Sequence, residues 1–275
     1  MKTKLPLFKT AACGFTLIEL LTVISIIGVL AAMIIPAVAR AKIKAQSART
    51  AVEISQLVGA IKQYESTYSR FPISKSARDA LLPGNPDYTF GTYVGDGSVN
   101  TLLDKKGRKL PPLGNKEQRQ NLMRNNSEVM AILLDMERFG NGQPTVNVGH
   151  GLNPQRVKFL DVKEVTDTRS PGIGMDGVYR DPWGNPYIIT MDVNFDNKCH
   201  DGVYRRAEVS QLSSTTGLNG LSLVKPENPG TDGSSDWFAA NTTVMVWSLG
   251  PDGWAETTGS AAKANAGFNK DNVLS

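Results

Sequence analysis

The stretch FTLIELLTVISIIGVLAAMIIPAV, from Phe15 to Val38, decides the fold of this chain. It is 24 residues long and carries a single charge, Glu19. A helix that rises about 1.5 Å per residue over this length can cross a bilayer core about 30 Å thick. The sequence therefore predicts a membrane-spanning helix over residues 15–38.

The segment before this stretch is basic and has no acid. It contains Lys2, Lys4 and Lys9. A cleavable secretory signal begins in the same way, but its apolar part is about 7–15 residues long and is followed by small residues at the cleavage site. Here the apolar run is longer, and the small residues AACG at 11–14 precede it. Any cleavage is therefore expected upstream, which leaves the apolar helix on the mature protein.

Composition and charge limit the partners of the rest of the chain. The 275 residues are 40% hydrophobic and 20% charged, an ordinary globular balance. The net charge is +4, and without the three leader lysines it is +1, so we expect no nucleic-acid partner. Cys13 lies in the leader, which leaves Cys199 as the one thiol of a mature chain. The positive-inside rule assigns no orientation, because basic residues also follow the span: Arg40, Lys42, Lys44 and Arg49.

The helix is expected to continue past the membrane to about residue 70. Apolar residues spaced three or four apart predict one stripe that packs on a globular head. The Phe71-Pro72 pair ends the helix, because a residue before proline disfavours the helical conformation. The stripe consists of Ile54, Leu57, Ile61, Tyr64 and Tyr68.

The Lys-rich leader, Gly14 and the run FTLIELL at 15–21 closely resemble the N-terminus of type IV pilins and type II secretion pseudopilins. The resemblance implies that a prepilin peptidase cleaves after Gly14 and that Phe15 is then N-methylated. It also implies that Glu19 pairs with the N-terminal amine of a neighbouring subunit during filament assembly. A carboxylate in hydrocarbon is costly, and such a pair would relieve that cost. Gly28 and Pro36 lie where this family places helix-weakening residues.

The head is expected to be α+β, with the long helix packed on a small antiparallel sheet. Turn-forming residues and short apolar runs predict its elements. These are a helix over 73–82, strands near 88–90 and 93–94, a helix over Ser127–Phe139 with Ser127 as its N-cap, and strands over 157–160, 188–190 and 244–248.

Two turn-strand pieces of the head resemble the pseudopilin family of general secretion pathway protein G. They are DPWGNPY at 181–187 and SLGPDG at 248–253. The resemblance covers residues 1–82, about 178–191 and 243–275. It implies three parts: a leader over 1–14, a long helix over 15–70, and a head over 71–275. Residues 83–175 and 192–240 are expected to be large, loop-rich insertions in that head.

The same resemblance implies a calcium site in the C-terminal loop. The matching positions are the carbonyl of Leu249 and the side chains of Asp252, Asp271 and Asn272. Oxygen ligands on a loop suit Ca²⁺. Asn272 stands where the family has an acid and the loop is longer, so a plain acidic surface loop remains an alternative. Asp192-x-Asn194-x-Asp196 is a weaker calcium candidate, because it lacks the Gly and Glu of an EF-hand loop.

No enzyme motif was found, and we expect a structural protein. The spelling G-x-G-x-x-G at 172–177 is rejected as a nucleotide motif, because strand and turn residues follow it where a helix is required. Cys199 and His200 are interpreted as surface residues, since neighbours in a strand or turn point in different directions.

These observations predict a structural subunit of a type II secretion pseudopilus. It would be anchored in the inner membrane with its head in the periplasm. Its partners would be identical or related pilin subunits, the prepilin peptidase and the inner-membrane assembly platform. One alternative is a type IV pilus subunit for adhesion or DNA uptake. Another is a membrane-anchored extracytoplasmic binding protein or enzyme.

Overall fold

The computed structural model describes residues 15–79, 87–92, 125–213, 216–224, 238–256 and 262–275. The chain forms two compact units, Met1–Ala45 and Gln46–Ser275, so the division falls inside the long N-terminal helix. The strands predicted at 93–94 and the cleavage site at Gly14 lie outside the described residues.

The predicted long helix is confirmed as α1, Leu17–Tyr68, and it includes Pro36. It ends as expected just before Phe71-Pro72. Ser69 has a positive φ of 52°, and its N–H closes the last turn on the carbonyl of Glu65 at 2.7 Å. One helix of the described chain is long and apolar enough to cross a membrane, and it is α1.

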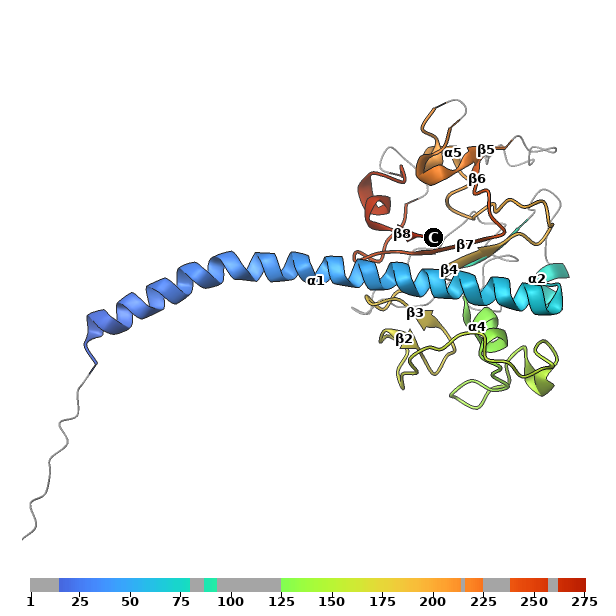
Figure 1. The fold of residues 1–275 in the computed structure, drawn as a ribbon, viewed down its shortest axis with the longest axis horizontal. Helices are drawn as coiled ribbons and strands as arrows, with labels where there is room; N and C mark the ends of the chain where they lie inside the picture. The colour runs from blue at the N-terminus through green and yellow to red at the C-terminus, as the bar shows by residue number, and fades with distance from the viewer. Residues whose placement is uncertain (1–14, 80–86, 93–124, 214–215, 225–237, 257–261) are drawn as a thin grey trace, which may run out of the picture. The chain divides into compact units, whose positions relative to one another are not determined.

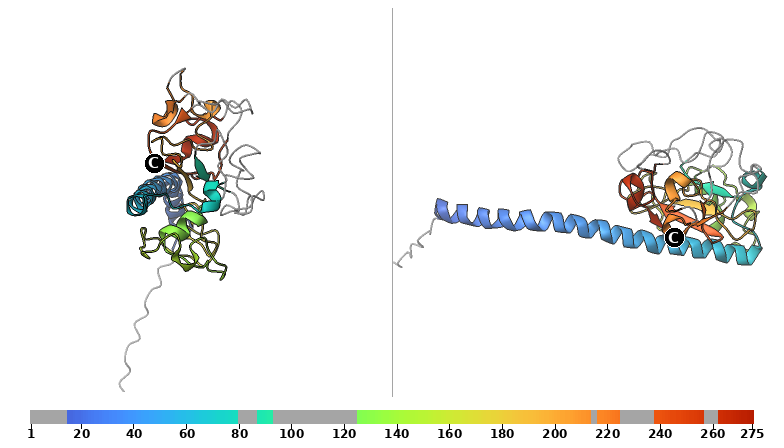
Figure 2. Two further views of the ribbon diagram at one scale, coloured as in Figure 1. Left: turned by 90° about the vertical axis from the view of Figure 1, so that its right-hand side faces the viewer. Right: turned by 90° about the horizontal axis from the view of Figure 1, so that it is seen from above.

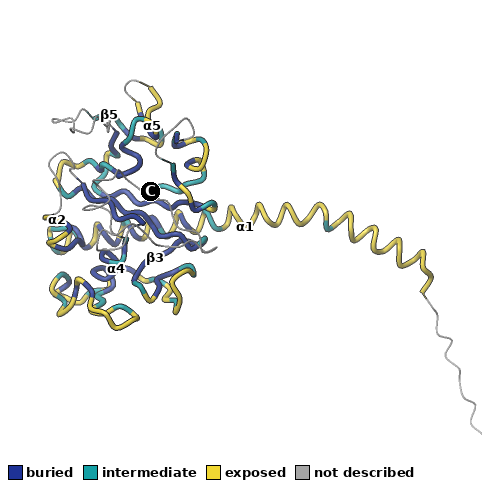
Figure 3. The backbone as a smooth tube through the Cα atoms, turned by 180° about the vertical axis from the view of Figure 1, so that it is seen from behind, coloured by how far each residue is buried: buried dark blue, intermediate teal, exposed yellow. Residues whose placement is uncertain are grey.

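The first part of α1, residues 17–45, is almost entirely exposed and is coloured yellow in Figure 3. The first buried side chain is that of Thr50, and the predicted stripe then follows. Four of its residues, Ile54, Leu57, Ile61 and Tyr64, are buried, and Tyr68 is half-buried.

The head contains the predicted antiparallel sheet. Its four strands are β1 (Tyr88–Phe90), β4 (Ile188–Met191), β7 (Val244–Ser248) and β8 (Val273–Leu274), in the order β1-β4-β7-β8. All three pairings are antiparallel. The strands predicted at 88–90, 188–190 and 244–248 are confirmed.

Side chains alternate between the two faces of this sheet, and both faces are buried. Ile189 and Val246 are paired across β4 and β7 and belong to the core that contains the α1 stripe. Ile188 and Trp247, the next pair, belong to a second core. The alternation follows from the two-residue period of a strand.

The first core joins α1 to both the sheet and α4, Ser127–Leu133. Figures 1 and 2 show the sheet on one side of the second part of α1, and α4 with the small hairpin of β2 (Gly172–Ile173) and β3 (Tyr179–Arg180) on the other. A hydrogen bond from Tyr187 Oη to Glu53 Oε2, 2.5 Å long, also ties the head to α1.

The second core combines buried residues of the segment 192–240 with residues of the sheet and of the C-terminal segment. This segment contains α5 (Ala207–Ser210), β5 (Ser222–Leu223) and β6 (Phe238–Ala239). It packs its apolar side chains on the outer face of the sheet, and Tyr204 meets Trp247 edge to face, with ring centroids 5.0 Å apart. The described residues of this segment therefore cover the outer face of the sheet, and that the segment is an insertion stays a prediction.

Two predicted elements of the head are corrected. The helix predicted over Ser127–Phe139 ends at Leu133, and its N-cap is Asn126, not Ser127. It stops because Asp135 adopts a positive φ of 56°. Residues 157–160 form no strand, since the N–H of Phe159 donates to the carbonyl of Leu133 and caps that helix at 2.9 Å.

The remaining helices of the head are short. The helix predicted over 73–82 is α2, Lys75–Asp79, and residues 80–82 lie outside the described chain. The described part of the head also contains three 3₁₀ turns: η1 (Val148–His150), η2 (Leu218–Gly220) and η3 (Gly267–Asp271).

Candidate functional site

Glu19 and Thr16 cap the start of α1 through reciprocal hydrogen bonds. The N–H and Oγ1 of Thr16 both donate to Glu19 Oε2, at 2.8 and 2.7 Å. The N–H of Glu19 donates back to Thr16 Oγ1 at 3.3 Å. This is a capping box, which satisfies N–H groups that a helix start leaves unpaired. The T-x-x-E spelling could have revealed it in the sequence, but our reasoning did not use it.

The other predicted residues of the N-terminal site are on or next to the same helix. Phe15 is 79% exposed and precedes the first helical residue. Gly28 and Pro36 both lie within α1, which continues through them in this single chain. Pro36 lacks the N–H that would bond to the carbonyl of Ala32. Loosening of this stretch within a filament stays a prediction, as do cleavage and methylation at Gly14 and Phe15.

The predicted calcium loop holds two buried oxygen atoms that lack a donor. Asp271 Oδ1 and Asn272 Oδ1 are both buried and accept no hydrogen bond in the described structure. The amide nitrogen of Asn272 is occupied, because it donates to Tyr204 Oη at 2.9 Å. Buried oxygens without donors are costly, so this pair has the character of a site for a cation.

Electrostatics at this loop also favour a positive charge. Burial raises the pKa of the Asp271 carboxyl, and the nearby negative charge of Asp252 raises it further. A cation held between these carboxylates would remove that penalty. No cluster of three or more His, Cys, Asp or Glu side chains within the described residues could bind a metal. An ion here therefore needs the amide oxygen of Asn272 and a backbone carbonyl such as that of Leu249.

The turn at 181–186 packs directly against this loop. Asp181 is fully buried and accepts the N–H groups of Trp183 and Asn185, both at 2.9 Å. Its other oxygen accepts the hydroxyl of Ser248. Burial raises the pKa of Asp181 to about 7, although the Ser248 hydroxyl and backbone N–H groups oppose the rise. Sequence reasoning assigned this turn to a family motif but gave its residues no role.

The weaker calcium candidate at 192–196 is arranged differently. Asp192 is buried and uses both carboxylate oxygens to accept backbone N–H groups, from Asp196 at 3.1 Å and Asn197 at 2.7 Å. Asp196 in turn accepts the N–H of Lys198 at 2.9 Å. These carboxylates brace their own loop, so they offer an ion fewer free oxygens than Asp271 and Asn272 do.

Cys199 and His200 are not the surface residues that the sequence suggested. Cys199 is fully buried, and burial raises the pKa of its thiol well above the usual range. His200 Nδ1 lies 3.2 Å from Oδ2 of the buried Asp87. Asp201 points elsewhere, to Thr190 and to the indole of Trp247. The three neighbours therefore bind different partners, as expected of side chains along an extended segment.

The glycine-rich spelling at 172–177 forms a hairpin. Strand β2 begins at Gly172 and β3 begins at Tyr179, and they pair antiparallel. The glycines fit close backbone contacts, since a Cβ on Gly172 would lie 2.4 Å from the carbonyl oxygen of Lys163. Strand β3 follows the glycines, where a nucleotide motif requires a helix.

Comparison with known proteins agrees with the N-terminal geometry. Residues 9–35 match the family described as the prokaryotic N-terminal methylation motif. The chain is 33% identical over 87 residues to type II secretion system core protein G of Klebsiella pneumoniae. It is 32% identical over 92 residues to the protein of that name from Aeromonas hydrophila and 35% identical over 91 residues to that from Dickeya chrysanthemi.

These matches are partial in both directions. They cover 30–32% of this chain, and 62%, 64% and 59% of the three relatives in the order given. The chain thus spans less than two thirds of the length of each relative. No solved structure matches it significantly. The chain carries the prokaryotic N-terminal methylation motif and, over less than a third of its length, is similar to core protein G of type II secretion systems.

Proposed function

We propose that this protein is a structural subunit of a type II secretion pseudopilus. The observation that carries the proposal is the first part of α1, where nearly every side chain from Phe15 to Ala45 is exposed although most of them are apolar. A surface of this kind needs lipid or other protein around it. The methylation motif and the similarity to core protein G favour a filament of such helices.

The proposed sequence of events starts in the inner membrane, with the head in the periplasm. The prepilin peptidase cleaves after Gly14, and Phe15 becomes the methylated N-terminus. The inner-membrane assembly platform then moves the subunit from lipid into a filament. There the apolar surface of α1 packs against the same surface of identical or related subunits.

Glu19 is proposed to set the register of that packing. In the single chain, both hydrogen bonds from Thr16 end on Oε2 of Glu19. Oε1 therefore stays available, among the described residues, to accept the N-terminal ammonium group of a neighbouring subunit. A charged pair in an apolar filament core would be strongly favoured over either charge alone.

We further propose that the head binds calcium. The carbonyl of Leu249 and the side chains of Asp252, Asp271 and Asn272 would hold the ion. The two buried oxygens without donors and the raised pKa of Asp271 support the fit. The ion would neutralise the acidic loop and hold the C-terminal strand β8 to it. Saturating CaCl₂ should raise the melting temperature of the full chain, and Asp252→Ala should abolish the shift.

The secretory role is tested by deleting the gene and comparing the extracellular proteins of the mutant and its parent. A pseudopilus subunit predicts that a defined set of secreted proteins is lost outside and retained in the periplasm. Complementation with the wild-type chain should restore secretion. An unchanged set of secreted proteins would contradict the proposal and favour a surface pilus.

A further inference from the structure

Both backbone polar groups of Gly250 are held by side chains, one from Ser248 at the end of β7 and one from Asn185 in the turn at 181–185. Its N–H donates to Ser248 Oγ at 3.0 Å, and its carbonyl accepts the amide N–H of Asn185 at 2.8 Å. The Ser248 hydroxyl in turn donates a hydrogen bond to the carboxylate of Asp181. Ser248, Asn185 and the carboxylate of Asp181 are all buried, so water does not compete for these bonds.

This arrangement fixes the direction of the Leu249 carbonyl. The carbonyl of Leu249 and the N–H of Gly250 belong to one planar trans peptide group, in which they point in opposite directions. When Ser248 Oγ holds the N–H, it also decides where the carbonyl points. Asp181 orients the hydroxyl, because it accepts the hydroxyl hydrogen bond and leaves an oxygen lone pair of Ser248 to accept the N–H of Gly250.

Gly250 also sets the approach of Asp271 to the loop. It has a φ of +67°, and a Cβ at this position would lie 2.4 Å from the backbone oxygen of Asp271 and 3.4 Å from its carboxyl carbon. Only glycine permits such contact in this conformation. At the other end, a Cβ on Gly253 would lie 2.8 Å from Asn185 Oδ1. The turn thus holds the loop at two glycines.

We propose that Asp181, Asn185 and Ser248 are positioning residues for calcium. They touch no ion themselves, and they hold the Leu249 carbonyl and the Gly250 backbone in the geometry that binding needs. The inference rests on the calcium site proposed above and extends it to neighbouring Ser248 and, through Asn185, to a turn 65 positions away from Gly250 in the sequence. Loss of such supporting bonds typically weakens metal affinity about 10–100-fold.

The test is calorimetric titration of the full chain in detergent micelles with CaCl₂. Asn185→Ala removes the bond to the Gly250 carbonyl, and Ser248→Ala removes the hydroxyl that links Asp181 to the Gly250 N–H. Both should weaken calcium binding about 10–100-fold. Ser248→Thr keeps the hydroxyl and should bind within a few-fold of wild type.

The matched control is Asn153→Ala. Asn153 is also buried and also donates its amide N–H to backbone carbonyls, those of Ile132 and Val157, but among the described residues it makes no bond to the loop. This variant should melt at a lower temperature in EDTA and keep the wild-type calcium affinity. A purely structural role for Asn185 would give the same pattern as the control.

The outcomes separate the two proposals. Wild-type affinity in both Asn185→Ala and Ser248→Ala would overturn the positioning role and leave the calcium site standing. No heat of binding by the wild type would overturn the calcium site and with it the positioning role. Neither result bears on the pseudopilus proposal, which the secretion experiment tests independently.

Discussion

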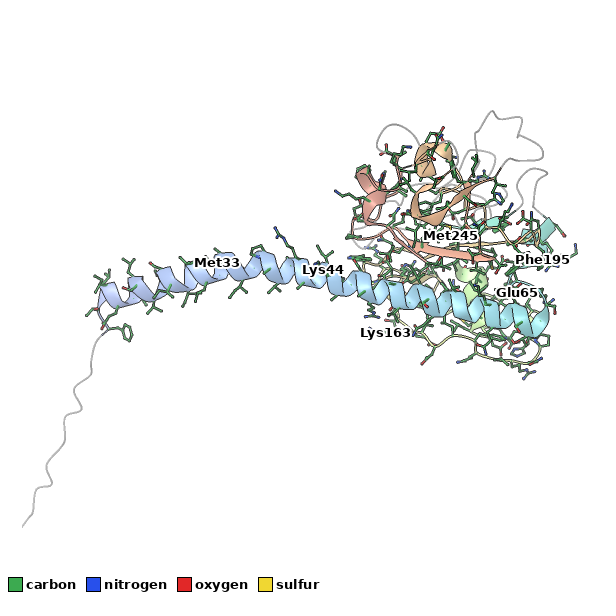
Figure 4. The ribbon with its side chains drawn as sticks, turned by 45° about the horizontal axis from the view of Figure 1, so that its top comes forward. Met33, Lys44, Glu65, Lys163, Phe195 and Met245 are labelled. Carbon is green, nitrogen blue, oxygen red and sulfur yellow. The ribbon has the colours of Figure 1, made fainter. Side chains whose placement is uncertain are left out.

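The two parts of α1 treat their apolar side chains in opposite ways, although both are equally helical. In the first part Met33 is 70% exposed, whereas in the second part Ile54 is 1% exposed. Figure 4 labels Met33 on α1, and it labels Met245 in the head, where this side chain is buried. The apolar side chains of the second part therefore pack on other residues of the same chain. The first part has no such partners among the described residues and needs lipid or other protein around it.

The largest expected effect comes from a substitution in the first part of α1. Glu19→Ala should abolish incorporation into filaments. The neighbour's ammonium group would lose its counter-charge in an apolar filament core. Cleavage should continue, and the melting temperature of the head should not change. Filament yield after shearing, with peptidase-processed chain as the loading control, checks this. Normal incorporation of the variant would refute the role given to Glu19.

A matched pair of leucines tests the two parts of α1 directly. Leu57→Ala removes a fully buried side chain and should lower the free energy of unfolding by about 2–5 kcal/mol. Leu21→Ala makes the same change at an exposed position and should leave head stability unaltered. Tryptophan fluorescence measures this selectively, because all four tryptophans follow residue 180. Equal losses would mean that the two parts are not independent.

A pH titration should change the stability of the head through Asp181, which lies in the head and not in the first part of α1. Asp181 has its pKa raised from 3.8 to about 7 on folding. The folded chain keeps a proton that the unfolded chain releases, so this contribution to stability is greatest below pH 4 and is lost as pH rises to about 7. The loss is at most about 4 kcal/mol.

Melting curves of wild type and Asp181→Asn in EDTA, between pH 4 and 8, check the sign. The wild type should lose stability relative to the variant as pH rises through this window. An opposite slope would show that the hydrogen bonds from Ser248 and the turn outweigh burial and keep Asp181 ionised.

The smallest expected effect comes from the bond between Tyr187 and Glu53. Tyr187→Phe removes a hydrogen bond to a carboxylate that also accepts from Arg49 at 2.8 Å, and it should cost about 1.5–3 kcal/mol. A double-mutant cycle with Glu53→Gln isolates the pair. Strictly additive losses would show that the bond does not couple α1 to the head.

The parts of the fold that follow from short-range rules could be predicted from the sequence. The stripe from Ile54 to Tyr64, the stop at Phe71-Pro72 and the strands β4 and β7 all depend on periodicity and turn residues. The N-terminal motif was equally readable, because its residues are contiguous.

Features that depend on distant partners could not be predicted. The side-chain amide of Asn126 donates hydrogen bonds to the carbonyls of Tyr179 and Tyr187, and these bonds fix the residue at which α4 begins. Phe159 caps the end of that helix and forms no strand. Strands such as β2 and β5 are too short to give a periodic signal. The unmatched oxygens of Asp271 and Asn272 appear only when burial and hydrogen bonds are known.

The central claim is that the exposed first part of α1 is the mature N-terminus of a filament subunit. Intact-mass analysis of the chain coexpressed with a prepilin peptidase tests it most directly. We expect a chain that begins at Phe15 with one added methyl group, and an unprocessed chain when a catalytically inactive peptidase is used. A chain that still begins at Met1 beside the active peptidase would contradict it.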